Sequence, residues 1–134
     1  MEVNFEIIEG PLDTKPEITR VDYDLHNLVV HIEPTYDGEP IVVTFDSSLG
    51  FRVLDEGNLL EFWDHFNLKD GWLFQISSGG WYDIESKRNG FVSQHHSDVR
   101  EYLILGVNEC VSVLSVEPPK VVVPGPNKQR QSDA

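Results

Sequence analysis

The 134-residue chain has almost no cysteine, few basic residues and no long hydrophobic run. A single cysteine, Cys110, excludes an internal disulfide framework and fits a reducing compartment, and we expect it to be a buried small hydrophobic side chain. No apolar stretch is long enough to span a bilayer, and the N-terminal residues MEVNFEIIEG carry acids where a signal peptide has a basic flank. These features predict a cytoplasmic protein.

Basic residues are outnumbered by acidic ones, 10 against 23, which gives a net charge of -13. Nearly all of the excess lies in residues 1–64, where 15 acidic residues accompany three basic ones. Such a surface repels phosphate and anionic lipid, so we expect neither nucleic acid nor a membrane as the partner. A basic protein is the partner that this charge favours, and acidity that only maintains solubility is the alternative.

Length and composition predict a single domain, because one hydrophobic core serves a chain of this size. We place this domain at residues 1–117. From Pro118 the pattern of hydrophobic residues is lost, and residues 118–134 are expected to be an extended or disordered tail.

Hydrophobic patterns predict about eight strands and one short helix. The helix, at about residues 58–67, has a capping-box spacing at Asn58 and Glu61 and an apolar stripe that needs cover from strands. Residues 11–19 are expected to be irregular. The predicted strands include 3–8, 21–25, 28–32, 41–45, 51–54, 72–76, 81–85, 102–107 and 110–116.

The last two of these segments are apolar on both faces, which predicts two neighbouring strands at the centre of a sheet. Alternating β and α units are absent. The sequence therefore favours an α+β fold in which an antiparallel, strongly twisted sheet packs on one helix. Gly79 and Gly80 are expected to form a turn rather than a phosphate loop.

No catalytic motif is present, so we expect neither an enzyme nor a cofactor. The cluster of His95, His96 and Asp98 is the nearest approach to a metal site, and a solvated polar loop is the alternative interpretation. Paired acids such as Asp22 with Asp24 and Asp83 with Glu85 are expected to point outward from strands as solvated carboxylates.

Two adjacent aromatic residues, Trp81 and Tyr82, must point to opposite faces of the predicted strand at 81–85. One of them is therefore available to a partner. An interface anchor and simple cover for a sheet edge are equally compatible with this position.

Several segments together resemble the small acidic immunity proteins that are encoded beside bacterial polymorphic toxins, including those of contact-dependent growth inhibition. They are GFRVLDEGNLLEFW, the Gly71–Trp72 pair, GGWYDIE and EYLILGVNECVSVLS, and the likeness covers residues 45–116. The resemblance implies a non-enzymatic cytosolic protein that binds a toxin's C-terminal domain and occludes its active site or an exosite. It carries over no functional residue.

An acidic surface is suited to a toxin whose active site grips nucleic acid and is therefore basic. The candidate partner-binding residues form two sets, one in the acidic half and one in the later aromatic segment. The first set is Asp22, Asp24, Tyr36, Asp37, Glu39 and Asp46, and the second is Trp81, Tyr82, Asp83 and Glu85.

Three other functions stay open at the level of sequence. A small hydrolase or metal-binding protein would use His95, His96 and Asp98. A regulatory adaptor would bind a partner that is not a toxin, and an acidic mimic of nucleic acid would bind a host or phage enzyme. Exposed strand edges are also compatible with a homodimer, for which the sequence offers no decision.

Overall fold

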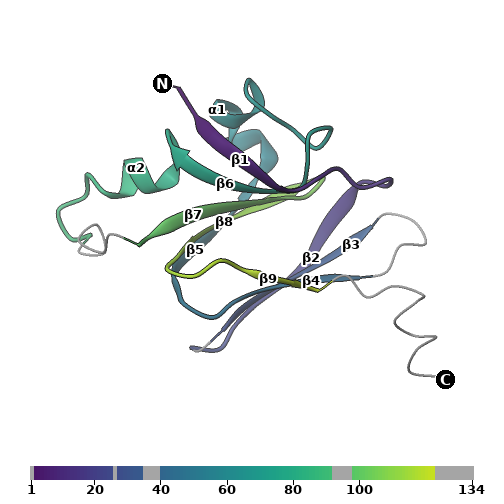
Figure 1. Cartoon of the computed structure of the whole chain (residues 1–134), viewed down its shortest axis with the longest axis horizontal. Coiled ribbons are helices and arrows are strands. Elements are labelled where there is room, and N and C mark those ends of the chain that lie inside the picture. The colour runs from purple at the N-terminus through teal and green to yellow at the C-terminus, as the bar shows by residue number, and fades with distance from the viewer. Residues whose placement is uncertain (1, 26, 35–39, 92–97, 123–134) are drawn as a thin grey trace.

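The computed structural model describes residues 2–25, 27–34, 40–91 and 98–122. Nine strands in these residues form two antiparallel sheets (Figure 1). The five-stranded sheet has the order β1 (Asn4–Glu9), β6 (Leu73–Ser78), β7 (Arg100–Leu105), β8 (Glu109–Ser115), β5 (Ser48–Asp55). The four-stranded sheet has the order β2 (Pro16–Tyr23), β3 (Leu28–Pro34), β4 (Ile41–Phe45), β9 (Lys120–Val122).

Three short helical segments complete the described fold: η1 (Glu56–Asn58), α1 (Leu60–Trp63) and α2 (Trp81–Glu85). The predicted α+β class is confirmed. Two details differ from the prediction, since the strands divide into two sheets and a second short α-helix is present. None of the helices in the described residues is long and apolar enough to cross a bilayer.

The main core lies between the two sheets, where alternate residues of each strand point inward. Val30 and Val43 of the four-stranded sheet belong to the same buried cluster as Leu73, Ile104 and Val113 of the five-stranded sheet. This period of two is the reason that each strand contributes every second residue to the core.

A second core covers the other face of the five-stranded sheet. Phe66, which follows α1, stacks on Phe74 of β6 with 4.2 Å between ring centroids, and Leu103 and Cys110 belong to the same cluster. Both faces of β7 and β8 are therefore buried, which confirms the prediction of two central strands. Burial of Cys110 is also confirmed, and it raises the pKa of the thiol to about 11.

The predicted helix at 58–67 is wrong in its start and its length. The carboxylate of Asp55 accepts from the backbone N–H of Gly57 at 2.8 Å and begins the tight turn η1, so Asn58 lies at the end of a 3₁₀ segment and caps nothing. The following helix α1 has no side-chain cap and only four residues. A turn closed by the bond from the N–H of Asn67 to Asp70 ends the segment.

Residues 16–19, which were predicted to be irregular, belong to β2. The register of β2 against β3 shifts between Ile18 and Arg20, where Thr19 is an extra residue. A bulge of this kind places Ile18 and Val21 on the same face although they are three residues apart. Regular alternation, the signal on which the prediction depended, is lost there.

The segment at 81–85, predicted as a strand, is the helix α2. Its two preceding glycines do form a turn, as predicted, and Gly79 has a φ of +81° that favours glycine. At Gly80 a Cβ atom would lie 2.6 Å from a carboxylate oxygen of Glu101, so only glycine allows this approach.

The two sheets differ in how their outer faces are covered. Figure 1 shows α1 and α2 on the side of the five-stranded sheet that points away from the four-stranded sheet. No described element covers the outer face of the four-stranded sheet. Within the predicted C-terminal tail, Lys120–Val122 pairs with β4 as the edge strand β9, and residues 123–134 lie outside the described part.

Candidate partner-binding site

The turn between β2 and β3 displays a leucine in a strained conformation. The N–H of Asp24 donates to the carbonyl of Asn27 at 3.2 Å, and the N–H of Asn27 donates to the Asp24 carboxylate at 2.8 Å. Between them, Leu25 has a φ of +86° and its relative exposure is 75%. A left-handed conformation costs a non-glycine residue about 1–2 kcal/mol. Because the Leu25 side chain is largely exposed, burial within the protein does not offset this cost.

Further apolar groups lie beside this turn. Tyr23 is 54% exposed and its ring contacts Phe51 of β5, with 5.7 Å between centroids. Leu49, at the start of β5, is also exposed. Tyr23, Leu49 and Phe51 line a shallow cavity of about 290 Å³ together with Ser48, whose hydroxyl oxygen is buried without a hydrogen-bond partner in the described residues.

Three of the predicted acids gather at this end of the four-stranded sheet. Leu28 is paired with Tyr23 on one side and with Phe45 on the other, so Asp24 and Asp46 each follow a partner of the same β3 residue. Asp22 lies on β2 just before Tyr23 and points to the outer face of the sheet, where it contacts Arg20 and His31. We define the hairpin surface by its acidic and apolar members: Asp22, Tyr23, Asp24, Leu25, Asp46 and Leu49.

Two carboxylates of the hairpin surface take part in ion pairs. Arg20 bonds to Asp22 at 2.8 Å and His31 lies 3.2 Å from it, and these contacts lower the pKa of Asp22. Asp46 pairs with Lys120 at 2.9 Å, which raises the pKa of that lysine. Both acids remain partly exposed, so a partner can approach them without first breaking a buried contact.

Two neighbouring acids on the outer face of the same sheet were not predicted as contacts. Glu17 of β2 is directly opposite Glu33 of β3, both are exposed, and neither has an ion pair within the described residues. Like charges in opposed positions destabilise a sheet. They escaped prediction because residues 11–19 were expected to be irregular, and Leu25 escaped because it was assigned to the strand at 21–25.

The second predicted set is brought together on α2, but its polar groups are engaged with the protein itself. The backbone N–H groups of Trp81 and Tyr82 donate to the two carboxylate oxygens of Glu101 at 2.9 and 2.8 Å. Asp83 accepts from the N–H of Gly79 at 2.6 Å. Glu85 accepts from the Trp81 indole at 3.1 Å and forms an ion pair with Arg88.

Sequence reasoning also missed the residues that hold α2 in place. Glu101 is only 2% exposed, and burial raises the pKa of its carboxyl although the two N–H groups and Arg52 oppose that shift. The Arg52 guanidinium lies 5.1 Å from the centre of the Trp81 ring. A carboxylate near the start of an otherwise apolar central strand, as Glu101 is in β7, was the available signal. Glu101 and Arg52 together form a structural anchor for α2.

Five of the residues singled out in the sequence lie outside the described part of the chain: Tyr36, Asp37, Glu39, His95 and His96. Asp98 is described and is exposed in a turn. Within the described ranges, no group of three or more His, Cys, Asp or Glu side chains is arranged to hold a metal ion. The predicted histidine cluster is not tested by this search.

Comparison of the chain with protein-family models, with curated proteins and with solved structures finds no match. The choice between the two predicted surfaces therefore depends on contacts within the molecule. At α2 the Trp81 indole and the acidic groups bind residues of the same chain, whereas Tyr23 and Leu25 present apolar surface to solvent beside carboxylates. The hairpin surface is thus the better candidate.

Proposed function

We propose that this protein is a non-catalytic binding protein that neutralises a basic toxin domain, in the manner of the small acidic immunity proteins that it resembles. The observation that carries the proposal is Leu25, a strained and largely exposed leucine that directly follows the acidic residue Asp24. Strain in an exposed turn is typical of binding sites, where contact with a partner offsets the cost.

The composition of the hairpin surface supports a binding hot spot. Affinity in protein complexes comes from a few desolvated anchors, and surrounding polar groups exclude water and set the orientation. Leu25 and Tyr23 have the exposed apolar area that such anchors need. Asp22, Asp24 and Asp46 supply a negative rim that steers a cationic partner toward them.

The charge indicates what kind of partner this is. A net charge of -13 attracts a domain whose surface is basic, and a site that binds nucleic acid is basic because it must hold phosphates. We therefore propose a nuclease toxin domain whose active site or exosite is occluded by the hairpin surface, with the complex formed in the cytoplasm.

Co-purification from the source cells, followed by a growth assay, tests this function. Tagged wild-type protein and Leu25→Asn are used as bait at low and high salt, and Leu60→Asn serves as the matched control because Leu60 is an equally large exposed leucine on α1. We expect one stoichiometric, salt-sensitive partner that wild type and Leu60→Asn retain and Leu25→Asn loses.

The gene of the recovered partner is then expressed alone and together with each variant. Growth arrest that wild type relieves and Leu25→Asn does not is the expected result. A partner that does not impair growth, or one that all three baits retain equally at both salt concentrations, contradicts the proposal.

A further inference from the structure

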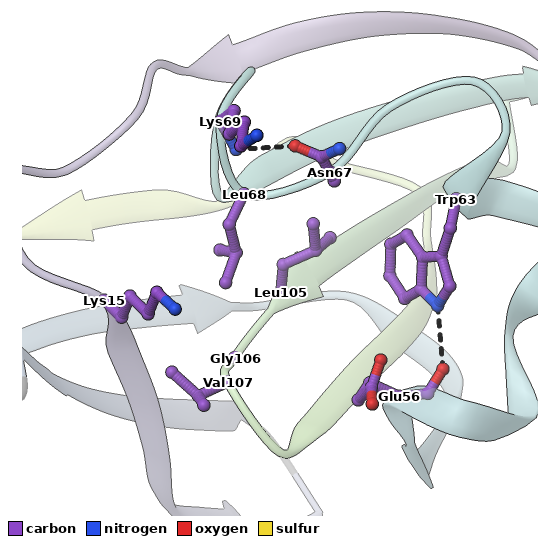
Figure 2. Close-up of a pocket in the computed structure, with 9 residues that line it drawn as sticks. All are labelled: Lys15, Glu56, Trp63, Asn67, Leu68, Lys69, Leu105, Gly106 and Val107. Atoms are coloured by element: carbon purple, nitrogen blue, oxygen red, sulfur yellow. Dashed lines mark hydrogen bonds between the residues drawn. The ribbon is translucent and has the colours of Figure 1, made fainter.

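A cavity of about 400 Å³ lies between three connecting segments (Figure 2). They are the loop before β2, the residues that follow α1, and the turn between β7 and β8. The lining residues are Lys15, Glu56, Trp63, Asn67, Leu68, Lys69, Leu105, Gly106 and Val107. This volume is in the range of small-molecule sites.

The apolar wall of the cavity is held in place by hydrogen bonds. The indole N–H of Trp63 donates to the carbonyl of Glu56 at 2.8 Å, which sets the orientation of the ring. The N–H of Val107 donates to the carbonyl of Pro16 at 2.9 Å, and this bond ties the β7–β8 turn to the start of β2. Leu105 is buried at the base of that turn. The wall is therefore formed before any ligand arrives.

Two lysines lie at this cavity in a molecule that is otherwise acidic. Figure 2 shows Lys15 reaching toward Leu68 and Val107 from the side opposite Trp63, with Lys69 near the end of the segment after α1. Neither lysine has an ion-pair partner among the described residues, whereas Lys120 pairs with a carboxylate. Two unpaired ammonium groups beside an apolar wall are complementary to an anion that carries an apolar body.

We propose that this cavity binds a small organic carboxylate with an aromatic or branched aliphatic body. The carboxylate lies toward Lys15, with Lys69 adding positive charge at the rim, and the body packs on Trp63, Leu105 and Val107. Glu56 lines the cavity near Trp63, on the side away from Lys15, and repels a carboxylate placed in the reverse orientation. This site is separate from the hairpin surface, so the proposal does not depend on the proposed binding of a toxin domain.

Titration of the ¹⁵N-labelled full chain with two matched probes tests the proposal. The probes are 4-phenylbutyrate and 4-phenylbutan-1-ol, which share the apolar body and differ in charge. The readout is the Trp63 indole N–H signal, assigned from its loss in Trp63→Phe. We expect the acid to shift this signal and to bind more tightly than the alcohol.

The double variant Lys15→Gln/Lys69→Gln is compared with Lys87→Gln, which removes the charge of an exposed lysine away from the cavity. Exposed ion pairs are individually weak, so loss of both lysines is expected to lower the affinity for the acid about fivefold and to leave the affinity for the alcohol unchanged. Val107→Phe, which fills the cavity, is expected to abolish binding of both probes.

Equal affinity for acid and alcohol overturns the proposal. So does binding of the acid that the double variant leaves intact, or a set of shifted signals that does not include Trp63 and its neighbours.

Discussion

Two segments of similar composition, 22–25 and 81–85, have opposite roles in this molecule. Both combine aromatic, aliphatic and acidic residues, and both contain residues that were predicted to contact a partner. In α2 the backbone N–H groups and the acidic side chains bind residues of the same chain. At the β2–β3 turn, Leu25 is exposed at a cost in backbone strain. The acidic groups of both segments bind residues of the same chain, so the exposed and strained apolar side chain of Leu25, which composition does not show, separates the binding segment from the structural one.

Removal of the α2 anchor is expected to have the largest effect on the free energy of unfolding. Glu101→Ala leaves the N–H groups of Trp81 and Tyr82 without an acceptor and removes a countercharge of Arg52. We expect a loss of about 3 kcal/mol, because buried groups without a partner are costly. Urea unfolding measures it. An unchanged stability shows that α2 is not held by Glu101, and then the two segments do not differ as described.

The pH dependence of the conservative variant Glu101→Gln sharpens this test. Burial raises the pKa of Glu101 above its usual 4.5, so the folded state holds this proton more tightly than the unfolded state. The resulting contribution to stability is complete below pH 4.5 and is lost as the pH rises through the folded pKa. Wild type is therefore expected to lose stability relative to Glu101→Gln over that range in urea titrations, and parallel pH profiles contradict the assigned burial.

Leu25→Asn tests the other half of the comparison, since it is expected to change stability and binding in opposite directions. Asparagine accepts a positive φ more readily than leucine, so the free energy of unfolding is expected to rise by about 1 kcal/mol. Loss of the apolar anchor is expected to lower the affinity for the recovered partner about tenfold. Urea unfolding and calorimetric titration measure the two effects. A fall in both stability and affinity shows that Leu25 has a structural role.

Charge reversal separates steering from anchoring at the hairpin surface. The double variant Asp22→Lys/Asp46→Lys changes two partly exposed acids outside the β2–β3 turn, and it is expected to slow association with the partner about tenfold at low salt and to change dissociation little. Glu61→Lys/Asp64→Lys is the matched control, because it makes the same charge change at two exposed acids near α1. Stopped-flow association at several salt concentrations measures both. Equal slowing in the two variants indicates an effect of net charge alone.

The parts of the fold that the sequence predicts well depend on local pattern. Residues 102–107 and 110–116 are apolar on both faces, and they form the central strands β7 and β8. The division into two sheets depends on pairing over long separations, such as Phe5 with Ile76. The alternation of apolar residues in a strand indicates which residues share a face, but it does not indicate which other strand pairs with that strand.

The site was harder to predict because distant residues decide its local structure. Trp81, Tyr82 and Ile84 have side chains that favour strands, yet Glu101 accepts the first N–H groups of this segment and stabilises a helix. The bulge at Thr19 hides the length of β2, and with it the opposed pair of Glu17 and Glu33. Asp22, Asp24 and Asp46 were identified from their acidity, whereas Leu25 could be identified only from its backbone φ angle in the structure.

The smallest expected effect provides the strictest test of the comparison. Ile84 of α2 is 54% exposed, so area alone makes it as good an anchor as Tyr23. Its backbone is helical and unstrained, and the polar groups around it are engaged with their own chain. Ile84→Asn is therefore expected to change the free energy of unfolding by less than about 0.5 kcal/mol and the partner's affinity not at all. If the same calorimetric titration shows a loss comparable to that of Leu25→Asn, exposed apolar area decides binding and backbone strain at Leu25 does not mark the site.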